Sequence, residues 1–387
     1  MATNPQPFTL HVPDADLADL EARLARTRLP DQAPGEPWAY GTDVAYLRSL
    51  IEYWRTSFDW RSHEARLNAF PQFKVPLRGI DVHYLHVPGK GPDPKPLLLM
   101  HGWPGSVFEF LELIPRLTDP LRFGGDAQDA FTVIAPSLPG YGLSFRPNQK
   151  RFGIAEMADC FTDLMVDVLG HRKFAAQGGD WGAHLCAALG VRHPDRVAGI
   201  HVNMLAIRLD QPLPVNPTPQ EQRYHEEVQV WLKEETGYST IQGTRPQTLA
   251  FGLTDSPAGL AAWIAEKFHG WTDHAGDHET AVSRDDLLAN IAFYWFTGAI
   301  GSSFWPYYDR MHGAWPIPGG STVDVPTGYA EFPRENRRPP RSIAERTYTD
   351  IRQWTVMFKG GHFAAMEQPE ALAADVRAFF RPLRQAF

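Results

Sequence analysis

The segment GGDWG, from Gly178 to Gly182, places an acidic side chain where an apolar, strand-like stretch gives way to a helix-forming one. Small residues two positions before and two positions after Asp180 permit a strained turn that exposes the central side chain, as a nucleophile requires. Serine is the usual residue there. Aspartate has a reference pKa of about 3.9, so Asp180 is ionised at neutral pH and could attack an electrophilic carbon without a base. A helix cap formed by Asp180 is the alternative that this turn alone leaves open.

A histidine and several acids follow Asp180 in the chain order that such a nucleophile needs for its partners. His362 comes after a Gly-Gly pair, directly behind the last predicted strand, where a general base is expected. We predict Glu335 as the acid that orients this histidine, because it lies in the loop after the strand-like stretch DVPTGY. Glu331 and Asp324 remain alternatives, and an exposed loop glutamate without a catalytic role is the other interpretation of Glu335.

The segment HGWPGS, from His101 to Ser106, follows the first predicted core strand. In this arrangement the loop after that strand supplies one backbone N–H to an oxyanion hole, and the residue after the nucleophile supplies the other. We therefore predict the N–H groups of Trp103 and Trp181 as the two donors. A plain turn formed by Pro104 and Gly105 explains the same residues.

Strand and helix signals alternate on both sides of these residues. Short apolar runs that stop at glycine are typical of buried parallel strands, and the alternation predicts a parallel sheet with helices on both faces. From residue 206 to residue 316 helical stretches replace the alternation, which predicts an inserted cap. The predicted strands are PLLLMHG, FTVIAPSLPGYGLS, KFAAQGG, VAGIHVNML, DVPTGYAEF and QWTVMFKGGHF, and the predicted core helices cover residues 107–117, 154–169, 181–193 and 369–380.

The region before the first core strand has its own pattern. It contains two predicted helices, at 14–28 and 42–54, and two extended segments, RLNAFPQFKVPL and IDVHYLHV, and we interpret it as a packing or lid element. The chain is thus predicted to have four parts: an N-terminal region at 1–90, a first core part at 91–205, a helical cap at 206–316 and a second core part at 317–387.

Composition limits the partners and the compartment. The 387 residues carry a net charge of -8, so neither nucleic acid nor an anionic membrane surface is an expected partner. The N-terminus lacks a secretory signal, and no apolar stretch approaches the roughly 18 residues of a membrane span. Cys160 and Cys186 fall in predicted helices, outside any metal-type spacing. We therefore expect no disulfide, no metal or organic cofactor, and a cytoplasmic location.

Together, GGDWG, HGWPGS, VPTGYAEFPRE and GGHFAAMEQPE resemble the motifs of the microsomal-type epoxide hydrolases. The stretches ETGY, LTDSPAGLAAWIAEKF and FYWFTGAIGSS resemble the cap of that family, and DLEARLARTRLP with YWRTSFDWR resembles its N-terminal domain, so the resemblance spans nearly the whole chain. It implies an α/β-hydrolase fold with a mostly parallel sheet, a helical cap and an N-terminal meander. It also implies that a small-molecule epoxide is opened to a vicinal diol through an ester on Asp180. One departure is that the chain lacks the membrane-anchoring helix of the animal enzymes, so no membrane anchor is expected.

The resemblance also implies two cap tyrosines that donate hydrogen bonds to the epoxide oxygen. The first is Tyr238, in ETGY, and the second is Tyr307, in SSFWPYYD, where a slip of one residue would select Tyr308. Tyrosine has a reference pKa of about 10, so both would be proton donors at neutral pH. An ordinary place in an aromatic core is the other interpretation of each.

Aromatic residues indicate an apolar substrate pocket. We predict Trp103, Trp181, Trp295 and Phe296 as substrate-binding residues, although the residues in the insertion, Trp263 and Phe268 included, suit a core equally well. The resemblance makes a homodimer plausible, and it leaves a role in detoxification or in secondary metabolism open.

Two other functions compete with epoxide hydrolysis. A haloalkane dehalogenase shares the fold and the aspartate nucleophile, and its tryptophan beside the nucleophile, like Trp181, can hold halide. The cap tyrosines and the N-terminal extension argue against it. A ligand-binding protein on a retired hydrolase scaffold is the second, since fold does not fix function. A serine esterase is disfavoured because the turn carries Asp180.

Overall fold

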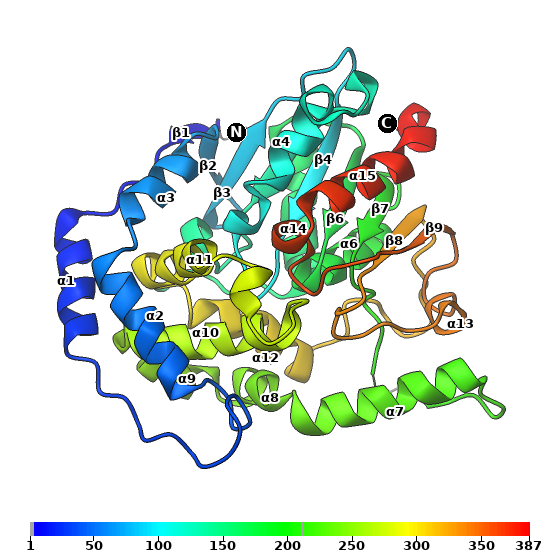
Figure 1. Ribbon diagram of the computed structural model, residues 1–387. Coiled ribbons are helices and arrows are strands. Elements are labelled where there is room, and N and C mark those ends of the chain that lie inside the picture. The colour runs from blue at the N-terminus through cyan, green and yellow to red at the C-terminus, as the bar shows by residue number, and fades with distance from the viewer. Residues whose placement is uncertain (1–3, 210–211) are drawn as a thin grey trace.

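A nine-stranded sheet organises the molecule in the computed structural model, which describes residues 4–209 and 212–387. The strands lie in the order β1-β2-β3-β5-β4-β6-β7-β8-β9, antiparallel as far as β5 and parallel from β5 to β9 (Figure 1). Their bounds are β1 Gln6–Phe8, β2 Gln72–Leu77, β3 Ile80–Val87, β4 Lys95–Met100, β5 Phe131–Pro136, β6 Phe174–Gly178, β7 Val197–Val202, β8 Thr327–Glu331 and β9 Ile351–Val356. The predicted mostly parallel sheet is confirmed.

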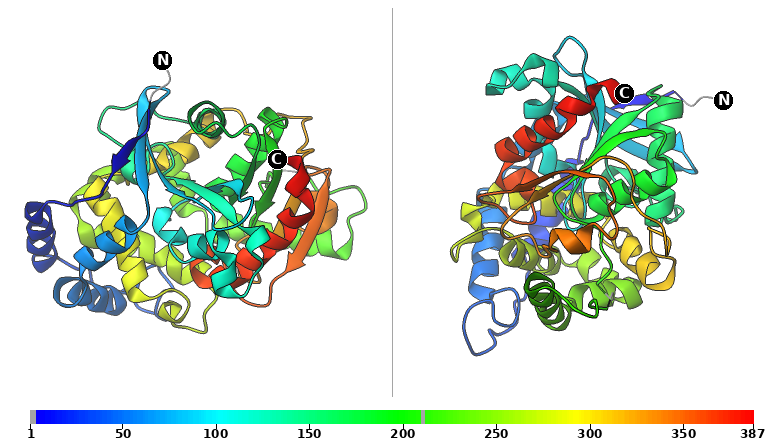
Figure 2. Two further views of the ribbon diagram at one scale, coloured as in Figure 1. Left: turned by 90° about the horizontal axis from the view of Figure 1, so that it is seen from above. Right: turned by 90° about the vertical axis from the view of Figure 1, so that its right-hand side faces the viewer.

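Helices cover both faces of this sheet, so the central strands are buried throughout. On one face α4 packs against α15, and on the other α5 packs against α6 (Figure 2). Strands β6 and β7 consist of buried residues alone, which explains why their sequences are largely apolar. The core helices are α4 Leu113–Thr118, α5 Ile154–Asp163, α6 Asp180–Arg192, α13 Arg341–Ala344, α14 Ala364–Glu367 and α15 Pro369–Phe380.

A helical cap is inserted between β7 and β8 and lies beyond the ends of the parallel strands (Figure 1). The N-terminal helices pack on this cap, because α1 and α2 contact α10, and α3 contacts α11. The cap helices are α7 Pro219–Glu234, α8 Gly237–Thr244, α9 Pro246–Asp255, α10 Pro257–Trp271, α11 Arg284–Thr297 and α12 Trp305–His312, and the N-terminal helices are α1 Asp14–Ala25, α2 Val44–Thr56 and α3 Trp60–Asn68.

The N-terminal region differs from its predicted form in two ways. Both extended segments are strands, but β2 and β3 pair with each other and join the central sheet through β5. The extended segment was expected to begin at Arg66, and that boundary is wrong because α3 continues to Asn68. Asp59 caps this helix at the backbone N–H of Arg61, and Trp60, Glu64 and Leu67 are buried at helical spacing.

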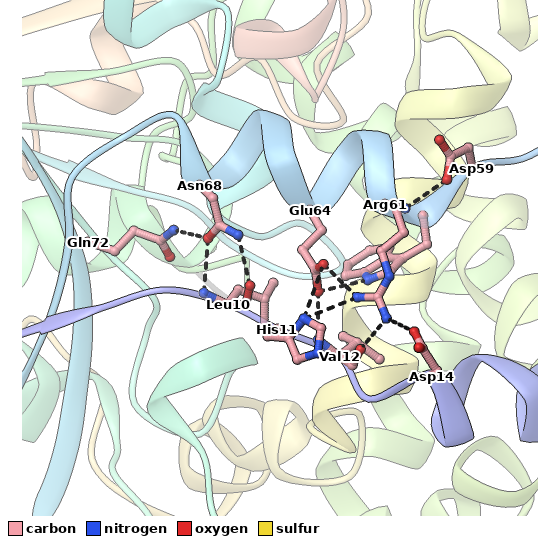
Figure 3. Close-up of polar contacts among 10 residues, drawn as sticks. Leu10, His11, Val12, Asp14, Asp59, Arg61, Glu64, Asn68 and Gln72 are labelled. Carbon is pink, nitrogen blue, oxygen red and sulfur yellow. Dashed lines mark hydrogen bonds and ion pairs between the residues drawn. The ribbon is translucent and has the colours of Figure 1, made fainter.

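Helix α3 holds the strap between β1 and α1 through side-chain hydrogen bonds to the strap's backbone (Figure 3). Asn68 accepts from the N–H of Leu10 at 2.9 Å and donates to its carbonyl at 2.8 Å. The buried Glu64 carboxylate accepts from the N–H of Val12 at 2.6 Å, and the Arg61 guanidinium donates to the Val12 carbonyl at 2.7 Å. The strap therefore depends on α3 for its backbone partners.

Replacement of Glu64 by alanine should destabilise the fold. The change leaves the buried N–H of Val12 without its acceptor, so we expect the free energy of unfolding to fall by about 1–3 kcal/mol, measured by urea denaturation. Asp14→Asn is the matched control, because Asp14 is exposed and its ion pair with Arg61 contributes less than about 1 kcal/mol. Equal effects of the two substitutions would contradict this account of the strap.

Among the described residues, no single helix is long and apolar enough to cross a membrane. One pair of helical segments, Arg284–Thr297 and Ser302–His312, meets that test jointly, with a bend of 106° between them.

Candidate active site

Asp180 lies at the turn between β6 and α6 with a φ of +46°, in the left-handed region that L-residues seldom adopt. The residues around Asp180 are packed so closely that a side chain would not fit at three neighbouring glycines. A Cβ on Gly178 would lie 2.5 Å from the carbonyl carbon of Gly182, and one on Gly182 would lie 2.1 Å from the Met100 oxygen. A Cβ on Gly102 would meet the Asp180 carboxylate at 2.3 Å. The structure thus has the strained turn that the GGDWG spacing predicts.

His362 and Glu335 reach this turn from the loops after β9 and β8. The Nδ1 atom of His362 lies 2.8 Å from Oε1 of Glu335, and its Nε2 atom lies 3.6 Å from Oδ2 of Asp180. Both residues are buried. Because the Glu335 carboxylate can only accept, Nδ1 of His362 carries the proton and Nε2 faces the aspartate.

The geometry distinguishes Glu335 from the other two candidate acids. Glu331 accepts a hydrogen bond from the Trp354 indole at 2.9 Å. Asp324 accepts from the hydroxyl of Thr349 at 2.7 Å and is exposed. Of the three, Glu335 is the one that the structure brings to His362.

The predicted backbone donors meet at the Asp180 side chain. The N–H of Trp103 donates to Oδ1 at 2.8 Å, and the N–H of Trp181 is a second donor to the carboxylate. Oδ1 is therefore held in place, while Oδ2 is directed toward His362.

Charge stabilises the ionised form of this pair. Burial opposes it, but the hydrogen bond and charge of His362 and the two backbone donors hold the pKa of Asp180 below its ordinary value. Burial would also lower the pKa of His362, yet the charges and hydrogen bonds of Glu335 and Asp180 raise it to about 10. The resting site thus carries a carboxylate nucleophile beside an imidazolium.

The two predicted cap tyrosines lie over this carboxylate. Tyr238, on α8, stacks on Trp103 with ring centroids 5.3 Å apart, and Tyr307, on α12, meets Trp181 edge-on at 4.8 Å. Burial raises the pKa of both phenols, so they stay protonated at neutral pH. Tyr308 instead stacks on residues outside the site, Trp305 and His312.

Two cavities meet at Asp180 and His362. One lies beneath the cap and is lined by Trp181, both tyrosines, Arg310 and Arg337. The other lies on the core side, is lined by Glu109, and has a volume of about 20 Å³, which is room for about one water molecule. The site therefore offers a place for a substrate and a separate place for water.

Comparisons with known proteins agree with this geometry. The family description "Epoxide hydrolase N terminus" matches residues 5–110, and "alpha/beta hydrolase fold" matches residues 95–265. Epoxide hydrolase 1 of Oryctolagus cuniculus is 38% identical over 403 residues, which cover 97% of this chain and 88% of that protein. A Stigmatella aurantiaca relative is 46% identical over 98% of this chain and 85% of its own. The chain belongs to the epoxide hydrolase family.

Solved structures of the family have the same fold. Juvenile hormone epoxide hydrolase from the silkworm Bombyx mori superposes with a TM-score of 0.85 at 33% identity, over 99% of this chain and 95% of that one. Aspergillus niger epoxide hydrolase also gives a TM-score of 0.85, at 30% identity over 99% of this chain and 97% of its own. This chain is an epoxide hydrolase with an α/β-hydrolase fold.

Two predicted substrate-binding residues of this epoxide hydrolase lie elsewhere. Phe296 packs against Trp60 of α3 at 4.9 Å, and Trp295 lies beneath the Arg23 guanidinium at 5.6 Å. The assignment of Trp295 and Phe296 to the substrate pocket is corrected, because both face the N-terminal helices. After its charged first turn, α11 is almost entirely apolar from Leu287 to Phe296, so its sequence could not show which face meets the site.

Another face of α11 supports the active-site loop. Asn290 donates to the carbonyl of Pro104 and the Tyr294 hydroxyl to the carbonyl of Gly105, each at 2.7 Å. These bonds position the segment whose backbone holds Oδ1 of Asp180. The other two aromatic residues considered in the insertion also have core partners: Trp263 donates to Gln242, and Phe268 stacks on Phe363.

Sequence reasoning missed Glu109, Arg310 and Arg337. Glu109 is partly buried, and its desolvation with the charge of Asp180 nearby raises its pKa to about 8 although His362 opposes the shift. None of the three belongs to a motif that the sequence singled out, and each reaches the site only through the tertiary fold. Within the described parts of the chain, no group of three or more His, Cys, Asp or Glu side chains could hold a metal ion.

The raised pKa of His362 predicts a pH effect on stability. A histidine with a pKa of about 10 in the folded protein and of about 6.5 in the unfolded chain stabilises the fold fully below pH ~6.5, and the contribution is lost as the pH rises toward ~10. We expect the free energy of unfolding to fall between pH 7 and pH 10, and to fall less in His362→Gln. Parallel urea titrations of the two proteins isolate this contribution, and identical pH slopes would refute it.

Proposed function

We propose that this epoxide hydrolase opens its substrate by attack of Asp180 Oδ2 on an epoxide carbon. A carbon–oxygen bond to the carboxylate forms as the ring carbon–oxygen bond breaks, and the ring oxygen takes a proton from Tyr307 or Tyr238. The observation that carries this proposal is the held carboxylate, whose Oδ1 is fixed by the Trp103 N–H at 2.8 Å in the cavity that the two protonated phenols line. The product of this step is a hydroxyalkyl ester on Asp180.

Water then releases the diol. Once Asp180 is esterified, the negative charge that helps to raise the pKa of His362 is gone, so the tyrosinate formed in the first step takes the Nε2 proton. The neutral Nε2 then accepts a proton from a water molecule that attacks Cγ of Asp180, with the imidazole oriented by Glu335. The cavity on the Glu109 side supplies the place for this water. The oxyanion develops on Oδ1, which the N–H of Trp103 already holds, and the N–H of Trp181 is a second donor to the same carboxylate. One such donor can lower the barrier by roughly 3–4 kcal/mol. The water oxygen stays in the carboxylate, one water proton goes to the diol, and the other restores the imidazolium of His362.

The tyrosines should affect the first step only. We expect Tyr307→Phe to slow ester formation by about 10²-fold, because the ring oxygen loses a proton donor. Stopped-flow quenching of the tryptophan fluorescence with styrene oxide measures this rate. Tyr308→Phe is the matched control and should leave the rate within about twofold, since its ring lies outside the site. If ester formation were slow in Tyr308→Phe and normal in Tyr307→Phe, Tyr308 and not Tyr307 would be the proton donor.

One observation suits a haloalkane dehalogenase. The indole N–H of Trp181 is buried and has no hydrogen-bond partner among the described residues, as a halide-binding group would. The paired tyrosines in the same cavity favour an epoxide, because a halide leaving group needs no proton. An assay of chloride release from 1-chlorobutane decides between them, and we expect none.

We further propose a cytoplasmic enzyme that detoxifies epoxides or serves secondary metabolism, and that forms a homodimer. Support for the compartment comes from Cys160 and Cys186, which are free and buried, as expected of a reducing environment. Cell fractionation with antibody detection tests the location, and light scattering tests the dimer.

A further inference from the structure

Two arginine side chains line the cavity beneath the cap together with Tyr238 and Tyr307. Arg310 lies on α12, and Arg337 lies in the loop that follows β8, two residues after Glu335. Both are partly buried. They reach the cavity from the cap and from the core, so the two cations converge on the same space from opposite sides of the site.

Neither guanidinium has a carboxylate partner within residues 4–209 and 212–387. Arg310 lies 5.8 Å from the ring centroid of Trp181, and Arg337 donates one hydrogen bond, to the Met204 sulfur at 3.2 Å. The Nε atom of Arg337 is buried and unpaired among these residues. Two of the strongest hydrogen-bond donors in the cavity thus lack the acceptor that guanidinium groups ordinarily find.

Such a pair is unfavourable unless something compensates it. Burial and the charge of Arg337 both lower the pKa of the Arg310 guanidinium, although the charge of Asp180, which lines the same cavity, opposes the shift. His184, which also lines the cavity, adds no negative charge, since it can only be neutral or cationic, and burial and the charge of Arg337 lower its pKa to about 4. Other partly buried arginines of the chain do have carboxylate partners, such as Arg66 with Asp286 and Arg284 with Glu279.

We propose that Arg310 and Arg337 bind an anionic group of the substrate, so that this enzyme prefers epoxides that carry a carboxylate. The inference rests on the proposed function, because it places that carboxylate in the cavity where Asp180 attacks the epoxide. A carboxylate accepts hydrogen bonds from two guanidinium groups and neutralises both charges in a site with little water. Tyr307 and Trp181, which line the same cavity, would then contact the apolar part of the molecule.

A matched pair of substrates tests this directly. We compare 4-(oxiran-2-yl)benzoate with its methyl ester, which have the same reactive ring and differ in one charge, and we use styrene oxide as the reference. We expect kcat/KM for the carboxylate to exceed that for the ester by about tenfold or more, and the ratio to shrink as salt is added. In Arg310→Gln and in Arg337→Gln the ratio should fall toward one.

The control variant is Arg338→Gln, which removes a neighbouring charge outside this cavity and should keep the wild-type ratio. Binding of 4-ethylbenzoate, measured by calorimetry, gives a readout that needs no turnover and should weaken in Arg310→Gln. A ratio near one in the wild type, with styrene oxide still converted to diol, overturns the inference and leaves the proposed function standing. An equal slowing of all three substrates in the arginine variants also overturns it. That result would mean that the two guanidinium groups act on the epoxide oxygen, which all three substrates share, and not on the carboxylate. Failure to convert any of the three contradicts the proposed function itself.

Discussion

Asp180→Asn should lose diol formation by about 10⁴-fold or more. The amide is the same size as the carboxylate and asparagine tolerates positive φ better than most residues, so the turn at +46° should keep its shape. What disappears is the negative charge that attacks the epoxide carbon. Chiral chromatography of the diol from styrene oxide gives the rate, and circular dichroism confirms the fold.

The control for this variant is Asp324→Asn, which changes an exposed acid that the sequence allowed as a triad member. Its activity should remain within about twofold of wild type. A folded Asp180→Asn protein with more than a few per cent of wild-type activity would remove Asp180 from the mechanism. Mass spectrometry of the purified variant excludes deamidation back to aspartate.

His362→Gln should stop the reaction halfway. The first step needs no base, so Asp180 should still react once with styrene oxide. Without an acceptor at the position of Nε2, the water in the second cavity is not activated, and hydrolysis of the ester should slow by about 10³-fold or more. Intact-protein mass spectrometry should then show one substrate molecule bound per chain, on the peptide that contains Asp180.

Glu335→Gln should slow hydrolysis of the ester by an intermediate amount. It keeps a hydrogen-bond acceptor near Nδ1 of His362 but removes the charge that stabilises the imidazolium, so its ester should turn over more slowly than in wild type and faster than in His362→Gln. A His362→Gln protein that forms no ester, or one that forms diol at the wild-type rate, would show that His362 does not serve the second step alone.

The parts of the site that the sequence could predict are those held by backbone constraints. A Cβ on Gly102, Gly178 or Gly182 would lie only 2.1–2.5 Å from neighbouring atoms, so these positions must be glycine and they leave a recognisable spacing in the sequence. The order of strands placed His362 and Glu335 in loops at one end of the sheet. Their contact at 2.8 Å then follows from the parallel topology.

Side chains that reach the site from one face of a buried helix were not predictable. Beyond its charged first turn α11 is almost entirely apolar, so Trp295 and Phe296 could not be distinguished from Tyr294, which the structure places on the active-site loop. Glu109 and Arg310 likewise look like ordinary surface charges in the sequence. Only the tertiary fold shows that both are partly buried and line the cavities that meet at Asp180 and His362.

The N-terminal region shows a further limit. Alternation of apolar residues predicted both extended segments, but strand pairing depends on partners far along the chain. The sequence therefore could not show that β3 would pair with β5 and extend the central sheet.

The central claim is that the substrate becomes an ester on Asp180. A single turnover of styrene oxide by excess enzyme in oxygen-18 water tests it most directly, with mass analysis of the diol and of the peptide that contains Asp180. We predict a first diol without solvent label and one labelled oxygen in the Asp180 carboxylate. Solvent label in the diol, with none in the peptide, would mean that water attacks the epoxide itself and would contradict the account.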